Sequence, residues 1–115
     1  AYIQEYFPIQ KDIRVVIIGN KIRLAYWRQA GPETFKTNLS QGGKIIMDPV
    51  PENALNLALE TSLKCGWNDI GLDLIEYQNR YYVLEANVKY GTRGFKQAGI
   101  DYKRLLLDLI LSGEI

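Results

Sequence analysis

Two apolar, aromatic-rich runs in the second half of the chain flank a polar turn and predict an antiparallel hairpin. The runs cover residues 71–76 and 81–87, and Gln78-Asn79-Arg80 lies between them. With a three-residue loop at 78–80, Tyr77 pairs with Tyr81. Strand side chains alternate between the two faces of a sheet. We therefore expect one face of this hairpin to be an apolar core face made of Ile70, Leu72, Leu74, Tyr82, Leu84, Ala86 and Val88.

The second face of this hairpin brings two carboxylates together. Asp73 lies directly opposite Glu85, Asn87 is one step further along, and only Gly71 lies opposite Asn87. Opposed carboxylates repel each other, and the cost rises when they lose water. Mg²⁺ would remove the repulsion, because it takes carboxylate and amide oxygens as ligands. The alternative is a solvated polar face, and a loop one residue shorter or longer would separate the two carboxylates onto opposite faces.

A second hairpin is predicted earlier in the chain. Residues 12–18 and 21–28 are joined by Gly19-Asn20, a two-residue turn that tolerates positive φ. With Ile18 paired to Lys21, Arg28 continues the apolar face at its end, where a charge needs a partner or an anion. The opposite face is more polar, with Asp12, Arg14, Lys21, Arg23 and Trp27 beside Val16 and Ile18. The apolar face collects Ile13, Val15, Ile17, Ile22, Leu24 and Tyr26.

The remaining pattern predicts two more strands and an amphipathic helix. We expect strands at residues 2–7 and 44–47. An i, i+3/i+4 apolar stripe predicts a helix over residues 52–65, which Gly66 ends. We expect Cys65, at the end of the stripe, to be a small buried hydrophobe.

The last part of the chain predicts a short helical turn and a second helix. The turn covers residues 95–98, and the helix covers residues 102–112 with Asp101 as its N-cap. Gly113 closes this helix. We expect its buried side to consist of Leu105, Leu106, Leu109 and Ile110. The elements together indicate an α+β fold in which helices pack on an antiparallel sheet.

Residues 29–43 form a polar loop between the first hairpin and the strand at 44–47. The loop contains Lys36, Thr37, Asn38 and the pair Gly42-Gly43, a composition whose backbone N–H groups can wrap a phosphate. It matches neither a P-loop nor a dinucleotide fingerprint. The alternative interpretation is an ordinary solvated loop.

Composition excludes several classes of protein. The 115 residues suffice for one domain, and a net charge of +1 gives no electrostatic footprint for nucleic acid or an anionic membrane. No apolar run reaches transmembrane length. The chain has no histidine, so His-based zinc sites and Ser–His triads are excluded within it. The single Cys65 excludes an internal disulfide framework and fits a reducing compartment, and we expect a cytoplasmic protein.

The order of these motifs resembles the C-terminal part of the ATP-grasp fold, and within it the RimK-like group of glutamate ligases. The resemblance runs through nearly the whole chain, and single pieces of it are weak. The ordered set is specific, with an aspartate and a glutamate twelve positions apart. It consists of Gln4-Glu5-Tyr6, Asp12-Ile13-Arg14, Gly19, Arg28, residues 35–39, Gly42-Gly43, Gly71-Leu72-Asp73 and Glu85-Ala86-Asn87.

The resemblance implies an enzyme that holds ATP between two α+β subdomains and joins a carboxylate to an amine through an acyl phosphate. Phosphoryl transfer of this kind depends mostly on positioning and charge neutralisation. By the resemblance, Arg28 faces the transferring phosphoryl group or the acyl phosphate; its alternative is an ordinary ion pair. The residues implied for adenine are Glu5 and Tyr6, for ribose Asp12, for phosphate Lys36, Thr37 and Asn38, and for one or two Mg²⁺ (or Mn²⁺) Asp73, Glu85 and Asn87.

Two departures from the family pattern affect the expected function. The family follows its Glu-x-Asn with a small residue and Pro-Gly, whereas here Val88-Lys89-Tyr90-Gly91 follows Asn87 without proline. This loop borders the acceptor site of the family. The family's N-terminal subdomain, with its phosphate-contacting lysines, is also absent. We therefore expect residues 1–115 to be a C-terminal subdomain cut from a longer ligase, with half a nucleotide site and no activity alone.

Three functions remain open from the sequence. The first is an ATP- and Mg²⁺-dependent carboxylate–amine ligase that adds glutamate or another amino acid to an acceptor. The second is a degenerate, non-catalytic ATP-grasp module that binds nucleotide or a protein partner, which the altered loop at 88–91 favours slightly. The third, from composition alone, is a small α+β interaction domain whose acidic hairpin binds nothing.

Overall fold

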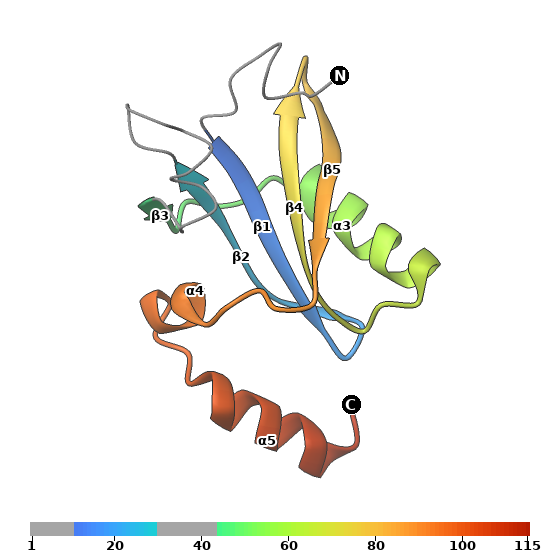
Figure 1. The fold of residues 1–115 in the computed structure, drawn as a ribbon, viewed down its shortest axis with the longest axis vertical. Helices are drawn as coiled ribbons and strands as arrows, with labels where there is room; N and C mark the ends of the chain where they lie inside the picture. The colour runs from blue at the N-terminus through green and yellow to red at the C-terminus, as the bar shows by residue number, and fades with distance from the viewer. Residues whose placement is uncertain (1–10, 30–43) are drawn as a thin grey trace.

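The computed structural model describes residues 11–29 and 44–115 (Figure 1). The predicted strand at 2–7 and most of the loop at 29–43 lie outside these ranges. The strands are β1 (Lys11–Ile18), β2 (Lys21–Gln29), β3 (Lys44–Ile46), β4 (Asp69–Tyr77) and β5 (Arg80–Asn87). The helices are α3 (Glu52–Cys65), α4 (Arg93–Gln97) and α5 (Tyr102–Ser112).

The strands form one antiparallel sheet in the order β3-β2-β1-β4-β5. Because β1 and β4 lie inside the sheet, most of their residues are buried. Helix α3 covers one face, while α4 lies near β2 and α5 runs below the sheet in the view of Figure 1. The α+β architecture predicted from the sequence is confirmed.

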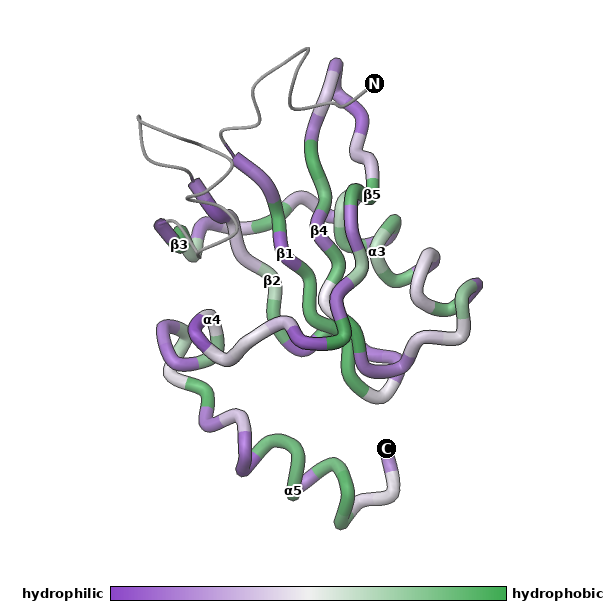
Figure 2. Tube along the Cα trace, viewed as in Figure 1, coloured by the Kyte–Doolittle hydropathy of each residue, from purple (hydrophilic) through white to green (hydrophobic). Residues whose placement is uncertain are grey.

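Each face of the sheet carries its own apolar cluster. The cluster on the α3 face consists of Ile13, Val15, Ile17, Ala54, Ala58, Ile70, Leu72 and Leu74. The cluster on the opposite face consists of Val16, Ile18, Leu24, Tyr26, Ile45, Tyr90, Phe95 and Leu109. Figure 2 shows apolar segments along β1 and β4.

In the β4–β5 hairpin, Asp73 pairs with Glu85 as predicted, but the loop and the register differ from the prediction. Tyr77 pairs with Arg80, so the loop has two residues rather than three, and both have positive φ. A bulge between Asp73 and Leu74 then leaves Leu84 as an extra residue on β5. The shorter loop and the bulge cancel, so Asp73 still lies opposite Glu85.

This register corrects the predicted faces of the hairpin near its tip. Tyr82 pairs with Ile75 and is exposed, so its predicted place on the core face is wrong. Leu84 occupies the bulge instead of continuing the core face as predicted. The residues that pack against the α3-face cluster from β5 are Tyr81 and Val83.

A second bulge corrects the prediction for the first hairpin. Ile18 pairs with Lys21 and Ile17 with Ile22 as expected, but Val16 then pairs with Leu24. Arg23 is the extra residue, and every later position of β2 turns to the opposite face. The consequence is that Leu24, Tyr26 and Arg28 lie on the face opposite to the predicted one, and Trp27 packs on the α3-face cluster.

The predicted boundaries of the two longer helices agree with the structure, whereas the helical turn predicted at residues 95–98 is the helix α4 at Arg93–Gln97. Helix α3 covers residues 52–65 and ends at Gly66 in the left-handed conformation. Helix α5 begins after Asp101, whose side chain accepts a hydrogen bond from the Arg104 backbone N–H, and it ends at Gly113. Among the residues that the structure describes, no helix is long and apolar enough to cross a membrane.

Two burial predictions for these helices are wrong. Cys65 is exposed, because the last turn of α3 extends past the sheet. In α5, Leu109 is buried and Leu105 and Leu106 pack against the cluster, but Ile110 is 59% exposed.

Helix α4 approaches β2 closely at a glycine. A Cβ atom added to Gly94 would overlap the Tyr26 ring and lie 2.8 Å from its hydroxyl. We expect Gly94→Ala to lower the free energy of unfolding by about 1–3 kcal/mol, because overpacking displaces buried atoms. Urea denaturation measures this change.

The control for this prediction is a double-mutant cycle with Tyr26→Leu, which removes the ring that a Cβ would meet. In that background Gly94→Ala should cost little, since alanine favours helix more than glycine does. Equal costs in both backgrounds would show that the close approach to Tyr26 is not the cause.

Tyr90 connects the sheet to α5. Its hydroxyl donates to Asp69 at 2.5 Å and lies 2.9 Å from the Tyr102 hydroxyl. Burial, together with these two contacts, raises the pKa of Tyr90 above its usual range. Tyr90 therefore stays protonated in the folded protein at a pH where it ionises in the unfolded chain, which makes folding weaker as pH rises above about 10.

We expect Tyr90→Phe to reduce the loss of stability between about pH 9 and pH 11, since the variant lacks this ionisation. The measurement is the urea midpoint as a function of pH. Tyr82→Phe is the matched control, because the Tyr82 side chain is exposed. An alkaline slope in Tyr90→Phe as steep as that of the parent chain would contradict the assignment.

Candidate functional site

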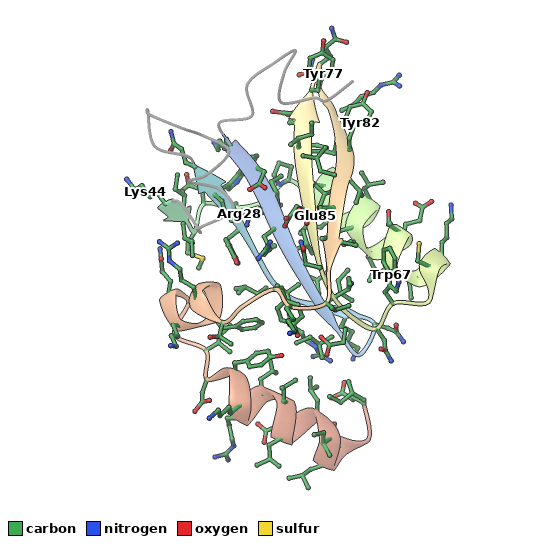
Figure 3. The ribbon with its side chains drawn as sticks, viewed as in Figure 1. Arg28, Lys44, Trp67, Tyr77, Tyr82 and Glu85 are labelled. Carbon is green, nitrogen blue, oxygen red and sulfur yellow. The ribbon has the colours of Figure 1, made fainter. Side chains whose placement is uncertain are left out.

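One row of side chains crosses the sheet on the face opposite α3. Tyr26 of β2 pairs with Arg14 of β1, Arg14 pairs with Asp73 of β4, and Asp73 pairs with Glu85 of β5. Directly paired residues of neighbouring strands point to the same face. Figure 3 shows Arg28 on β2 and Glu85 on β5 over the middle of the sheet.

Asp73 is the centre of this row, and it is only 4% exposed. Arg14 binds it with two hydrogen bonds, from Nε to Oδ1 at 2.8 Å and from Nη2 to Oδ2 at 3.0 Å. Oδ2 also lies 3.1 Å from Arg28 Nη2 and accepts a hydrogen bond from Asn87 Nδ2 at 3.2 Å. Four strands thus contribute to one carboxylate.

Arg28 holds a second buried carboxylate. Its Nε and Nη2 donate to the two oxygens of Asp12 at 2.8 and 2.5 Å. Burial opposes the charge of Arg28, but the carboxylates of Asp12 and Asp73 outweigh it and raise the pKa of Arg28 above its usual range. Burial also raises the pKa of Asp12, although Arg28 acts against this shift.

The structure brings together five of the ten predicted site residues. Asp12, Arg28, Asp73, Glu85 and Asn87 come from four strands and share one face. Arg28 forms an ion pair with Asp12, and it also lies beside Asp73. The predicted nucleotide contacts Glu5, Tyr6, Lys36, Thr37 and Asn38 lie outside the described residues.

Arg14 is the site residue that the sequence analysis did not single out. Arg14 belongs to the Asp12-Ile13-Arg14 motif and to the polar face predicted for the first hairpin. Its importance depends on the pairing of β1 with β4, and the hydrophobic pattern does not specify which strand lies beside which. The sequence contains a partial signal for Arg14, because two carboxylates that face each other on one hairpin are stabilised by nearby cationic side chains.

The donor atoms present fit a hard divalent cation. Asp73 Oδ2 is contacted by three donors. Asp73 Oδ1 accepts only one hydrogen bond, so it keeps a lone pair for a ligand. Within residues 11–29 and 44–115 there is no group of three or more His, Cys, Asp or Glu side chains that could hold a metal. A set of two carboxylates and one amide, completed by water and phosphate, is the kind that Mg²⁺ uses.

Comparison with known proteins places the chain in a family. The model of the RimK-like ATP-grasp domain matches residues 1–110, and the chain belongs to this family. It is 31% identical over 114 residues to a coenzyme gamma-F420-2:alpha-L-glutamate ligase from Methanococcus maripaludis, covering 95% of this chain and 39% of that protein. It is 32% identical over 111 residues to a probable alpha-L-glutamate ligase from Shewanella frigidimarina, and this match covers 94% of this chain and 37% of that protein.

Solved structures share the fold. The ATP-grasp ligase PsnB, complexed with a precursor peptide and AMPPNP, superposes with a TM-score of 0.65 at 18% identity, over 93% of this chain and 32% of that one. The D-alanine–D-alanine ligase from Bacillus anthracis, complexed with ATP, superposes with a TM-score of 0.62 at 18% identity, over 94% of this chain and 39% of that one. The chain thus spans less than two fifths of the length of each of these two relatives and two structures.

The buried pair of Arg28 and Asp12 generates a stability prediction. Arg28→Met leaves the Asp12 carboxylate buried without its partner, so we expect a loss of about 3–5 kcal/mol near pH 8. An unpaired buried carboxyl is protonated more readily in the folded than in the unfolded state. The loss should therefore shrink as pH falls toward about 4, where Asp12 becomes neutral.

Urea denaturation at several pH values measures this dependence. Lys21→Met is the control on the same strand, because it removes only an exposed ion pair with Glu114 and should cost less than about 1 kcal/mol. A cost of Arg28→Met that is independent of pH would show that Asp12 does not drive the destabilisation.

Proposed function

We propose that this chain is the C-terminal, metal-binding part of an ATP- and Mg²⁺-dependent carboxylate–amine ligase. The observation that carries the proposal is the shared face of Asp73, Glu85 and Asn87, with Arg28 beside Asp73. Family membership and the glutamate ligases among the relatives support it. The share of the relatives that the chain covers fits a protein whose N-terminal ATP-grasp subdomain supplies the other half of the nucleotide site.

In this proposal, each residue of the face has a defined task. Asp73, Glu85 and Asn87 hold one or two Mg²⁺ (or Mn²⁺), which when bound neutralise phosphate charge. Arg28 stabilises the negative charge of the phosphoryl group during transfer. Asp12 lies near the ribose and orients the Arg28 guanidinium, to which it is already bound. The residues proposed for adenine are Glu5 and Tyr6, and those for phosphate are Lys36, Thr37 and Asn38.

The proposed reaction has two steps. A carboxylate oxygen of the acceptor attacks the γ-phosphorus of ATP, and ADP leaves, which produces an acyl phosphate. The amine of the donor attacks the acyl carbon, inorganic phosphate leaves, and an amide forms as the amine loses a proton. The names of the relatives favour glutamate as the donor. We place this reaction in the cytoplasm, in agreement with the single cysteine.

A non-catalytic module that binds nucleotide or a protein partner is the second candidate. The segment after Asn87, which lacks the family proline, favours it. ATP consumption that requires both a carboxylate and an amine would support the ligase. Binding of nucleotide and metal without any such turnover would support the module.

Glu85→Gln tests the metal site with little risk to the fold, because Glu85 is exposed on an edge strand. In the full-length protein we expect it to weaken the binding of Mn²⁺ in the presence of ADP by about tenfold or more. It should also abolish ligation, with an unchanged melting temperature. Electron paramagnetic resonance of free Mn²⁺ measures the affinity.

Glu76→Gln is the matched control, since it neutralises another exposed carboxylate of the same hairpin near its tip. It should leave the affinity for Mn²⁺ unchanged. If Glu85→Gln binds Mn²⁺ as tightly as Glu76→Gln does, the hairpin face is not the metal site.

A further inference from the structure

Arg14 has three separate contacts that no role proposed above uses. Its Nε and Nη2 donate to the two oxygens of Asp73, and its Nη1 donates to the backbone carbonyl of Tyr90 at 2.8 Å. The side chain is only 14% exposed, so it is held firmly between its partners. One guanidinium therefore joins the carboxylate at the centre of the site to the segment that follows β5.

The segment after β5, residues 88–91, is held in place by three contacts of Tyr90. Arg14 donates to the Tyr90 carbonyl, the Tyr90 side chain packs on Gly71, and the Tyr90 hydroxyl donates to Asp69. Gly71 and Asp69 belong to the strand that carries Asp73. The path of residues 88–91 is thus tied to the same strand as the proposed metal ligand.

The contacts of Asp73 decide which of its oxygens remains open. Oδ2 is contacted by Arg14, Arg28 and Asn87, which uses its acceptor capacity. Oδ1 accepts only from Arg14 Nε. Because the two hydrogen bonds from Arg14 are parallel, the carboxylate cannot rotate without breaking both of them.

We propose that Arg14 is a positioning residue that holds the Asp73 carboxylate with Oδ1 open to a divalent cation and couples it to residues 88–91. This inference rests on the function proposed above. Arginine suits the task because its planar fork reaches two carboxylate oxygens and one carbonyl together. A lysine in its place keeps the charge but loses the fork. Neighbours that orient a metal ligand change metal affinity by about 10–100-fold when they are altered.

The test compares Arg14→Lys with the parent in the full-length protein. We expect the affinity for Mn²⁺ with ADP present, measured by electron paramagnetic resonance, to fall by about 10–100-fold. The affinity for ADP without metal should stay the same. A purely structural role would instead lower both affinities together with the melting temperature.

Arg23→Lys is the matched control. Arg23 is also a part-buried arginine of the first hairpin that donates to a backbone carbonyl, that of Ile18, but the structure gives it no contact with Asp73. It should leave the affinity for Mn²⁺ unchanged. Equal effects of the two substitutions, or an unchanged Mn²⁺ affinity in Arg14→Lys, would overturn the role of Arg14 and leave the proposed function standing.

Hydrogen exchange provides a readout of the coupling. Mg²⁺ with ADP should slow amide exchange in residues 88–91 of the parent and much less in Arg14→Lys. Equal slowing in both proteins would overturn the coupling. If the parent binds neither Mn²⁺ nor Mg²⁺ with ADP, the proposed function fails and the inference fails with it.

Discussion

The neutralisation of one buried carboxylate governs the arrangement of this sheet. Asp73 lies on an inner strand, and an unpaired charge at such a place would cost several kcal/mol. Two guanidiniums, Arg14 on β1 and Arg28 on β2, supply the compensation. Both reach Asp73 only if their strands are in register with β4, because a slip of one residue turns a side chain to the other face.

The same cluster contains one more carboxylate than guanidinium. Asp12, Asp73 and Glu85 contribute three carboxylates, and Arg14 and Arg28 contribute two guanidiniums. The two arginines pair with the buried acids, whereas Glu85 is exposed at the edge of the sheet. The buried charges of this face are therefore paired, and the unpaired carboxylate in excess is the exposed Glu85.

Sequence reasoning predicted the elements well and the faces of two strands poorly. Helix caps such as Asp101 and Gly113 are local signals, so the boundaries of α3 and α5 agree with the structure. The bulge at Arg23 has no local signal in the hydrophobic pattern, so Leu24, Tyr26 and Arg28 were placed on the wrong face. In contrast, Asp73 was correctly paired with Glu85 only because the shorter loop and the bulge at Leu84 offset each other.

The compensation between that loop and that bulge has a consequence for comparing homologues by alignment. An insertion of one residue in the turn at Gln78-Asn79 would reverse the facing of β5 unless the residue at Leu84 were deleted. Gaps in homologous chains should therefore occur in pairs of opposite sign, one at the turn and one at the bulge. The spacing from Asp73 to Glu85 would then stay constant while the residues between them shift, and an alignment that treats the turn as a freely variable loop would misplace them.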